Sequence, residues 1–396
     1  MESAQEIEER FGAAIFQKFP LTIVKGKGAK VWDQSGGEYV DFMAGIGVAI
    51  VGHCNPDVVE AVKSQAEKLI TCHGSFYNDA RSGFLERLAS VAPKGLDKAV
   101  LTNSGTETVE AALKLARRYT GRKKFVSMKG AFHGKTMGAL SATWNKKYRE
   151  PFAPLVDGVE FAEFGNAASV APLVTNETAA VIAEPIQGET GVIIPPPDFL
   201  KEVREICDRA GALLILDEIQ SGLGRTGRMW ASEHWGVVPD IMATSKGLGG
   251  GVPLGAALTT PEIASRLQRG EHTGTFAGNP LACAAGSAAL DFIRKNNLPA
   301  VAETKGKRLK ERLVEIASGH KVAREVRGLG MMLALETRID IHQLLLDAIG
   351  RGAIFAYSGK ETFRLLPPLV IDDSQIARGM EVLEGVLDAE DKRRFG

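Results

Sequence analysis

ALLILDE (212–218) and DIMATSK (240–246) are the two stretches that decide the fold. Both are short and apolar on both faces, which is typical of strands that helices cover on either side of a sheet. Three further runs have the same character, namely AVLT (99–102), FVSM (125–128) and AAVIAE (179–184). Because helical stretches separate these runs, the pattern predicts an α/β fold built around a wound, mostly parallel sheet.

Residues that start and stop helices divide the rest of this region. The stretches 106–120 and 198–210 each end at a glycine, and the second follows three prolines, which is how helices commonly begin and end. Asn55 and Pro56 predict the start of another helix. Before them, residues 22–42 alternate in polarity around the turn sequence SGGE, which predicts a hairpin.

The pattern changes after about residue 285. Two long helices, a group of strands and a terminal helix follow, and we predict them at 281–295, 298–318, 322–336, 363–366 and 373–388. The chain has 396 residues, more than one hydrophobic core usually holds. We therefore predict a large, mostly parallel-sheet domain and a smaller α+β domain, divided into residues 1–50 (an N-terminal segment of the smaller domain), 51–285 (the large domain) and 286–396 (the smaller domain).

Composition limits the classes of partner. Lys plus Arg and Asp plus Glu both number 48, so the net charge is zero and gives no global reason to expect nucleic-acid or membrane binding. The charged N-terminus lacks the apolar core of a secretion signal, and no apolar run reaches 18 residues. We expect a cytoplasmic protein with no metal site, because no CxxC pair occurs among Cys54, Cys72, Cys207 and Cys283.

Four polar motifs follow predicted strands, at the edge where open α/β sheets bind ligands. Free N–H groups at the helix start after Asn103 form an anion site. Asp217, at the mouth of a buried strand, needs a cationic partner such as the pyridinium nitrogen of pyridoxal phosphate (PLP). Lys246 precedes GLGGG and is placed to form a Schiff base, and the fourth motif is HTGTFAGNP (272–280). Each alone also fits a cap, a turn or a surface lysine, but together they predict a cofactor site.

The order of motifs resembles that of the class III, or ornithine-type, aminotransferases. The motifs are SGTE (104–107), FHG (132–134), EPIQGE (184–189), DEIQSGLGRTG (217–227), SKGLGGGVPLGA (245–256), HTGTFAGNPLA (272–282) and FRLLPPLVI (363–371). The resemblance covers essentially the whole chain. It implies the PLP-dependent transferase fold type I, and within the family the chain looks most like the acetylornithine and carrier-protein-linked enzymes of lysine and arginine biosynthesis.

The resemblance also implies the contacts of the PLP ring, residue by residue. Lys246 resembles the lysine that holds PLP and later serves as general base and acid. Asp217 resembles the carboxylate that pairs with the pyridinium nitrogen. Phe132 and Ile219 would pack on opposite faces of the ring, and Gln220 would donate a hydrogen bond to its phenolic oxygen.

The implied phosphate contacts come from two subunits. Gly105 and Thr106 would bind the phosphate through backbone and hydroxyl groups. Thr275 would reach the phosphate of the neighbouring subunit, which implies a homodimer. For His133 the sequence leaves open a position near the ring or an ordinary structural role.

Five positions bear on the substrate. Arg364 resembles the arginine that takes the α-carboxylate of glutamate, and Glu189 resembles the gate that masks it, although a purely structural ion pair is the alternative. Lys135 stands where the family usually has an arginine that clamps a substrate carboxylate, and lysine lacks the bidentate fork. Gly274 stands where related enzymes often have serine. Ile46 stands where enzymes of free ornithine carry tyrosine, which favours a substrate with a blocked α-amino group.

The leading interpretation is an aminotransferase that uses glutamate and 2-oxoglutarate and makes lysine, and also ornithine, on a small acidic carrier protein. Two basic runs are candidates for steering that partner: Lys146, Lys147 and Arg149, or Arg117, Arg118, Arg122, Lys123 and Lys124. The alternatives are an N-acetylornithine aminotransferase, a 4-aminobutyrate or other ω-amino transaminase, and an aminomutase. A dinucleotide oxidoreductase is disfavoured because no suitably placed GxGxxG follows a strand, and a non-enzymatic binding module is disfavoured because four polar motifs share one sheet edge.

Overall fold

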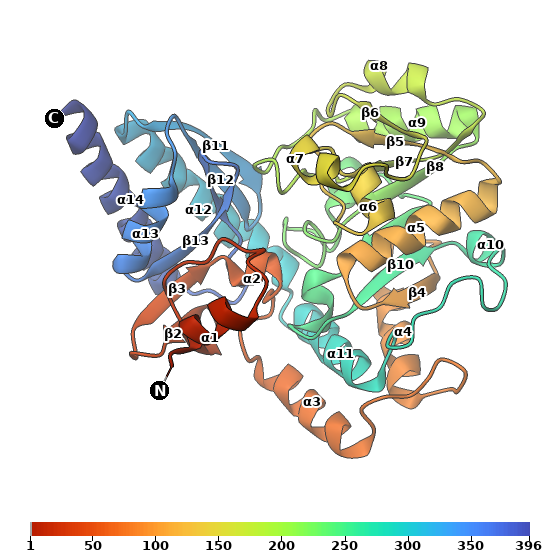
Figure 1. The fold of residues 1–396 in the computed structure, drawn as a ribbon, viewed down its shortest axis with the longest axis horizontal. Coiled ribbons are helices and arrows are strands. Elements are labelled where there is room, and N and C mark those ends of the chain that lie inside the picture. The colour runs from red at the N-terminus through yellow and green to blue at the C-terminus, as the bar shows by residue number, and fades with distance from the viewer. Residues whose placement is uncertain (1) are drawn as a thin grey trace.

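The computed structural model describes residues 2–396, which form two seven-stranded sheets with helices around them (Figure 1). The first sheet has the strand order β4-β10-β9-β8-β7-β5-β6. Its strands are β4 (Lys98–Thr102), β5 (Lys124–Met128), β6 (Val159–Ala162), β7 (Thr178–Ala183), β8 (Leu213–Asp217), β9 (Ile241–Thr244) and β10 (Gly255–Thr259). Strand β10 runs antiparallel to β4 and β9, and the other neighbours are parallel. The carboxyl ends of the other six strands therefore lie at one edge.

All five strands predicted for this sheet are present, and the α/β prediction is confirmed. The sequence pattern missed two strands. Strand β10 is made of small residues (GAALT), and β6 is a short, partly exposed edge strand (VEFA), so neither has the long apolar run that marks the others. Strand β4 is also partly exposed, against our expectation, because it forms the opposite edge of the sheet.

Three predicted helices are confirmed with their caps. Helix α3 (Pro56–Lys68) starts at the side-chain cap of Asn55. Helices α5 (Gly105–Thr120) and α9 (Phe199–Ala210) end at Gly121 and Gly211, whose φ angles of 70° and 62° lie in the left-handed region that favours glycine. Helices α5 and α9 cover the first sheet, whereas α3 packs against helix α11 (Pro280–Lys295).

Helix α4 (Asp79–Val91) is as long as α3. Short helical elements join the larger ones. They are α2 (Ala44–Gly47), α6 (Met137–Ala142), α7 (Lys146–Arg149), η1 (Glu150–Phe152), α8 (Ala167–Val170), η2 (Ala171–Leu173), η3 (Ala231–Trp235), η4 (Lys246–Gly249) and α10 (Pro261–Ala264). Several of them follow the carboxyl ends of the strands, where the predicted site residues are.

The second sheet joins the two ends of the chain. Its order is β1-β2-β3-β13-β14-β12-β11, and its strands are β1 (Ile23–Lys27), β2 (Lys30–Asp33), β3 (Glu38–Phe42), β11 (Ala323–Leu329), β12 (Met332–Thr337), β13 (Ala353–Ser358) and β14 (Thr362–Leu365). Strand β3 pairs in parallel with β13. The N-terminal segment therefore forms one sheet with the C-terminal strands.

The hairpin predicted at 22–42 needs correction, because the segment forms three strands. The SGGE turn joins β2 to β3 as predicted. A second turn between β1 and β2 passes through Gly28, whose φ of 60° serves a tight reversal. Helix α13 (His342–Gly350) and strand β13 were also not predicted, because the apolar residues of IHQLLLDAIGRGAIFAYS (341–358) are continuous and show no clear period.

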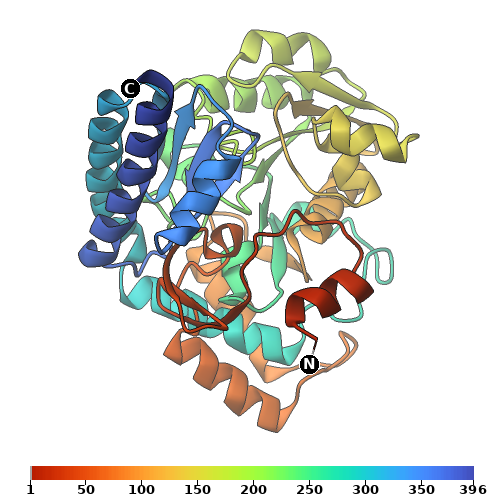
Figure 2. The ribbon, with the colours of Figure 1, turned by 60° about the vertical axis from the view of Figure 1, so that its left-hand side comes forward.

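Three long helices complete the C-terminal part. Helix α11 (Pro280–Lys295) packs against α3 and α4. Because it spans residues 280–295, the domain boundary that we place between residues 285 and 286 falls inside this helix. Helices α12 (Leu298–Gly319) and α14 (Asp373–Phe395) lie side by side over the second sheet (Figure 2). Helix α14 continues beyond the predicted end at residue 388. The proposed domain boundaries stay a prediction.

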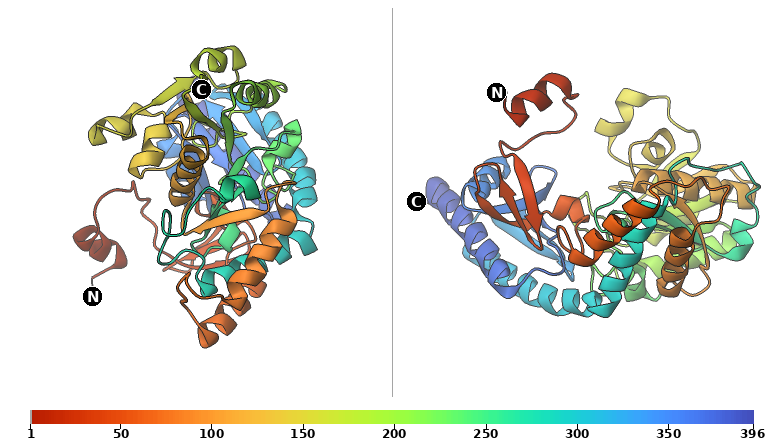
Figure 3. Two further views of the ribbon diagram at one scale, coloured as in Figure 1. Left: turned by 90° about the vertical axis from the view of Figure 1, so that its right-hand side faces the viewer. Right: turned by 90° about the horizontal axis from the view of Figure 1, so that it is seen from below.

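The N-terminal helix α1 (Ala4–Phe11) stands away from the rest of the molecule in both views of Figure 3. None of its residues is buried, and the apolar side chains of Ile7 and Phe11 are exposed. In residues 2–396, no helix combines the length and the apolar character that a membrane span requires.

We predict that Gly306→Ala destabilises the protein. A Cβ atom at Gly306 would lie 2.1 Å from the backbone oxygen of Gly330, so α12 would have to move away from the β11–β12 turn. Overpacking of this kind costs about 1–3 kcal/mol. Urea unfolding should show this loss, whereas Gly319→Ala in the same helix, where no atom lies within 4 Å, should leave stability nearly unchanged. Equal stabilities of the two variants would contradict the prediction.

Candidate active site

Asp217 and Lys246 lie at the same edge of the first sheet. Strands β8 and β9 are parallel neighbours, with Asp217 opposite Ala243, and Lys246 follows directly after the end of β9. The structure thus brings together the two residues that the sequence placed at strand ends. Their position fits the rule that open α/β sheets bind ligands beyond the carboxyl ends of their strands.

Asp217 has a buried histidine as its partner. The Nδ1 atom of His133 lies 2.7 Å from Oδ2 of Asp217, and the backbone N–H of Ile219 donates to Oδ1 at 3.1 Å. Both side chains are almost fully buried. The Nε2 atom of His133 is buried and has no partner in residues 2–396. His133 therefore lies in the candidate site, where one ring nitrogen contacts Asp217 and the other has no hydrogen-bond partner in the described residues.

A second buried carboxylate, Glu184, lies beside this pair. Its Oε2 accepts a hydrogen bond from the N–H of Phe132 at 3.1 Å, and its Oε1 accepts one from the N–H of Gly188 at 3.2 Å. Burial raises the pKa of Glu184 to about 7, with His133 opposing and Asp217 reinforcing the shift. The sequence analysis did not select Glu184, although it follows strand β7 just as Asp217 ends β8, and this position was the available signal.

The surroundings of Lys246 are dry and highly charged. Burial lowers the pKa of its ammonium group, and the Arg364 guanidinium lowers it further, while Glu189, Asp217 and Glu184 oppose the shift. Its backbone φ of 40° is in a region that a non-glycine residue seldom adopts. A lysine with a lowered pKa is more often in the neutral, nucleophilic form.

Arg364 reaches Lys246's surroundings from the second sheet. Its Nη1 donates to Oε1 of Glu189 at 2.8 Å and to Oε1 of Gln220 at 3.3 Å, and its Nε donates to the carbonyl of Tyr357 at 3.1 Å. The guanidinium is 2% exposed and the Glu189 carboxylate 34% exposed. Burial raises the pKa of Glu189, but the Arg364 and Lys246 cations outweigh it, so the net pKa is lowered. This contact is expected if Glu189 is a gate that masks Arg364, and it is equally expected if the two residues form a purely structural ion pair.

The SGTE motif starts helix α5 next to the β8 end. The side chain of Ser104 caps the N–H of Glu107, while the other N–H groups of the first turn have no acceptor within the helix. A Cβ atom at Gly105 would lie 3.0 Å from the side chain of Ile219, so these two predicted residues are adjacent. The Thr106 hydroxyl lies 2.8 Å from that of Thr136. This arrangement fits an anion beside a flat apolar group.

Phe132 and Lys135 are connected through a tyrosine that the sequence analysis did not select. The rings of Phe132 and Tyr148 meet edge to face, with centroids 6.1 Å apart. The ammonium of Lys135 lies 4.4 Å from the centroid of the Tyr148 ring. The only signal in the sequence was the position of Tyr148 among the basic residues of the stretch 142–156.

Gly274 and Thr275 lie apart from the other predicted residues. Their loop is exposed, and no hydrogen bond or ion pair joins either residue to the rest of the predicted site within residues 2–396. The contact of Thr275 with a neighbouring subunit therefore stays a prediction.

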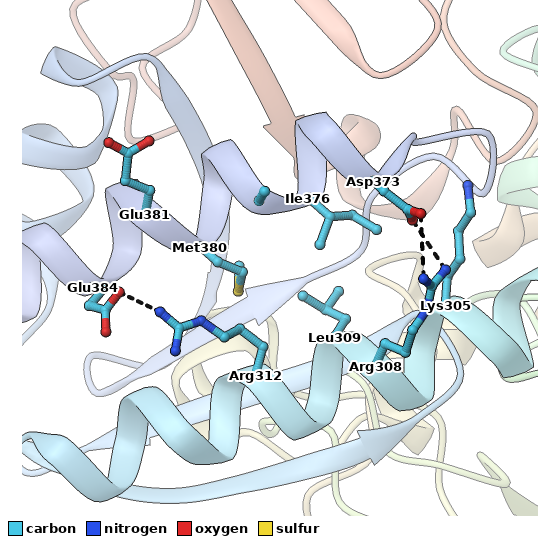
Figure 4. Close-up of a pocket in the computed structure, with 10 residues that line it drawn as sticks. Lys305, Arg308, Leu309, Arg312, Asp373, Ile376, Met380, Glu381 and Glu384 are labelled. Carbon is cyan, nitrogen blue, oxygen red and sulfur yellow. Dashed lines mark hydrogen bonds and ion pairs between the residues drawn. The ribbon is translucent and has the colours of Figure 1, made fainter.

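A groove elsewhere on the surface contains none of the predicted residues. It has a volume of about 490 Å³ and lies between α12 and α14 (Figure 4). Its charges are satisfied within the protein, since Arg308 pairs with Asp373 at 3.2 Å and Arg312 pairs with Glu384 at 2.6 Å. The candidate active site is therefore the strand-end cluster around Lys246.

Known proteins identify the family. The family model described as Aminotransferase class-III matches residues 12–387. The chain belongs to the class III aminotransferases. This class III aminotransferase is 47% identical over 388 residues to the acetylornithine aminotransferase of Methanopyrus kandleri, which covers 98% of this chain and 99% of that protein. It is 46% identical over 373 residues to the LysW-aminoadipate semialdehyde/glutamate semialdehyde transaminase of Sulfolobus acidocaldarius, over 94% and 96% of the two chains.

A solved structure gives the same fold. The ornithine aminotransferase of Toxoplasma gondii, which holds PLP at its active site at partial occupancy, superimposes with a TM-score of 0.95 and 32% identity, over 98% of this chain and 94% of that one. The predictions of a fold type I enzyme, of aminotransferase activity and of PLP as cofactor are confirmed. When bound, PLP supplies an electron sink for the carbon that loses a proton. A buried carboxylate, a lysine of lowered pKa and a helix start fit its ring nitrogen, aldehyde and phosphate.

We predict that Glu184→Gln changes how stability depends on pH. The pKa of Glu184 rises from its usual 4.5 to about 7 in the folded protein, so the folded state holds this proton more tightly than the unfolded chain. As pH rises from about 4.5 to 7, the wild type therefore loses roughly 3 kcal/mol from this group. Glutamine has no proton to lose, so the variant should gain relative to the wild type over this window.

Urea unfolding of the cofactor-free protein at pH 5 and pH 8 measures this difference. The exposed substitution Glu311→Gln is the control and should show no such trend. A stability difference between Glu184→Gln and wild type that stays constant with pH would contradict the assignment.

Proposed function

We propose that this aminotransferase moves an amino group from glutamate to the terminal semialdehyde of a carrier-protein-linked 2-aminoadipate, giving lysine, and to the corresponding glutamate semialdehyde, giving ornithine. The observation that carries the proposal is the Arg364–Glu189 pair beside Lys246. Relatives named for these carrier-linked reactions and for acetylornithine, at 46% and 47% identity, support both this substrate class and its alternative, N-acetylornithine. A 4-aminobutyrate or other ω-amino substrate is the more distant alternative.

Within this proposal, Lys246 would hold PLP through its aldehyde group, and its amine would accept and return the substrate proton. Its lowered pKa supports both tasks, because a neutral amine is needed to accept the proton. Asp217 would pair with the ring nitrogen, and His133 holds Asp217 in place. Phe132 and Ile219 would enclose the ring.

The remaining cofactor contacts are assigned in the same way. Gly105 and Thr106 would take the phosphate at the start of α5, where N–H groups are free of partners within the helix. Gln220 would donate to the phenolic oxygen. Its amide lies against the backbone of Gly188, where a Cβ atom would be only 2.0 Å away, so the glycine leaves room for Gln220.

The ion pair explains how one site takes two kinds of substrate. Arg364 would bind the α-carboxylate of glutamate once Glu189 moves aside. Glu189 is partly exposed whereas Arg364 is buried and held by the carbonyl of Tyr357, so the carboxylate is the partner that is free to move. When a terminal amine binds, Glu189 stays in place and cancels a charge that would otherwise attract the wrong end of the substrate.

Ile46 supports a substrate without a free α-amino group. It packs against the apolar cluster that contains Leu366, close in sequence to Arg364, and its φ is 61°. A β-branched residue in this conformation is unusual, so the backbone of this loop is fixed by its surroundings. An isoleucine offers no hydroxyl to anchor an α-amino group.

Exposed apolar residues near Thr275 support a homodimer. Phe76, Tyr77 and Phe276 are all exposed. The Arg81 side chain holds their loops together, because it donates to the carbonyls of Phe76 and of Gly278. Surfaces of this kind commonly become covered by a partner, and Thr275 would then reach the phosphate of that second subunit.

Of the two basic runs, residues 117–124 offer the partner little free charge. Arg118 pairs with Glu271, and Lys124 pairs with Glu177. The guanidinium groups of the other arginines in this run donate to backbone carbonyls. The cations of this run are therefore mostly used within the protein.

The run on helix α7 is the better candidate for binding an acidic carrier protein. Lys146 and Lys147 are exposed and form no ion pair within residues 2–396. Tyr148, on the same short helix, contacts Phe132 of the candidate active site. A carrier on α7 would therefore be close to Phe132 of the candidate active site.

We predict that reversing the charge on α7 weakens the use of a carrier-linked substrate. Lys146→Glu with Lys147→Glu should lower kcat/KM for that substrate about tenfold or more at low salt, because attraction becomes repulsion. The loss should shrink as salt rises. Steady-state kinetics at two salt concentrations measure it. The matched double variant Lys123→Glu with Lys201→Glu, two other exposed lysines, should have a much smaller effect, and equal losses would reject α7 as the docking site.

We predict that the enzyme prefers the carrier-linked substrate to the free ones. Purified enzyme with 2-oxoglutarate should show the highest kcat/KM for the carrier-linked amine, a lower value for N-acetylornithine and the lowest for 4-aminobutyrate. Lys246→Ala should lose at least about 10²-fold in turnover with all of them, while Lys201→Ala keeps full activity. Turnover of free 4-aminobutyrate alone would reject the substrate proposal, and reaction without 2-oxoglutarate would indicate an aminomutase.

A further inference from the structure

Lys135 is a flexible cation with few restraints. It is exposed and forms no ion pair within residues 2–396, and its ammonium lies over the face of the Tyr148 ring, 4.4 Å from the centroid. A lysine loses considerable side-chain freedom when it binds a ligand. An arginine would present a planar fork that is already organised, whereas a lysine is a mobile point charge. Something must therefore hold Lys135 if it is to bind a carboxylate well.

Tyr148 is built into the site wall and not merely onto the surface. Its helix α7 begins at Asn145, whose side chain accepts from the N–H of Lys147 at 3.0 Å. Tyr148 is half-buried, in contrast to the exposed lysines before it. One part of its ring meets Phe132, and its face meets Lys135. The ring thus links a residue of the cofactor site to a free cation.

Arg364 is the second cation of the candidate site. It is buried and reaches the site from strand β14 of the second sheet, whereas Lys135 is exposed and lies on the Tyr148 ring, which also contacts Phe132. Burial raises the pKa of Tyr148, and Glu189 and then Tyr357 raise it further, while Arg364 opposes them. The two cations match in number the two carboxylates of a five-carbon dicarboxylate.

We infer that Tyr148 is a positioning residue for dicarboxylate recognition, which holds the ammonium of Lys135 over its ring so that Lys135 and Arg364 bind opposite ends of 2-oxoglutarate or glutamate. This inference rests on the proposed function, because it assumes that 2-oxoglutarate is the amino acceptor. It assigns a role to the aromatic ring and not to the hydroxyl group.

The holoenzyme variants Tyr148→Leu and Tyr148→Phe test the inference. Tyr148→Leu removes the ring and should raise KM for 2-oxoglutarate about two- to fivefold, the effect of losing an exposed cation–π contact. Its kcat, and its KM for the amine substrate, should change little. Tyr148→Phe keeps the ring and should behave nearly as the wild type. A loss in Tyr148→Phe as large as that in Tyr148→Leu would overturn the role of the ring.

A double-mutant cycle with Lys135 separates positioning from a general structural effect. Lys135→Met alone should raise KM for 2-oxoglutarate at least as much as Tyr148→Leu. In the Lys135→Met background, Tyr148→Leu should have no further effect. An equal effect of Tyr148→Leu in both backgrounds would show that Tyr148 does not act through Lys135. Should Tyr148→Leu not fold, the KM of Lys135→Met still decides whether Lys135 binds the acceptor.

The same measurements distinguish the two levels of the argument. A wild type that does not use 2-oxoglutarate at all would overturn the proposed function, and this inference with it. A wild type that uses 2-oxoglutarate while its KM ignores both Lys135 and Tyr148 would overturn the inference alone.

Discussion

The buried carboxylate of Asp217 is the constraint on which the rest of the site depends. Burying a charged carboxylate at the end of an apolar strand costs free energy unless the carboxylate has hydrogen-bond or ionic partners. The chain supplies His133 and the N–H of Ile219, and a cationic ring nitrogen would add a third partner. Burial raises the pKa of Glu184, next to it, and the negative charge of Asp217 adds to that shift. The two buried carboxylates are therefore held in different surroundings.

The active site also depends on how the two sheets meet. Arg364 belongs to the second sheet, but its partners Glu189 and Gln220 follow strands of the first. Arg225 makes the reverse connection, because it leaves the β8 end and donates to the carbonyls of Met331 and Pro367. With no carboxylate partner, its burial lowers its pKa to about 9. Both arginines join the sheets, so a movement of one sheet relative to the other would alter the substrate site.

In the proposed function, substrate choice depends on a few residues at the edge of the site. Lysine at 135 keeps the charge of the usual arginine but needs an aromatic ring to hold it, and Tyr148 lies in that position. Isoleucine at 46 offers no hydroxyl, and its φ of 61° lies in a region that β-branched residues seldom adopt. In the proposed function, different residues therefore carry the reaction and its specificity.

The sequence by itself determined five of the seven strands of the first sheet, the caps of helices α3, α5 and α9 and the positions of Asp217 and Lys246, because apolar runs and cap residues act over a few neighbouring positions. It did not reveal β13, the three-stranded N-terminal segment or the roles of Glu184 and Tyr148. These depend on contacts between distant segments: β3 pairs with β13, and Glu184 accepts from Phe132. Only the tertiary structure decided them, since burial, shared charge and ring contacts arise when such segments come together.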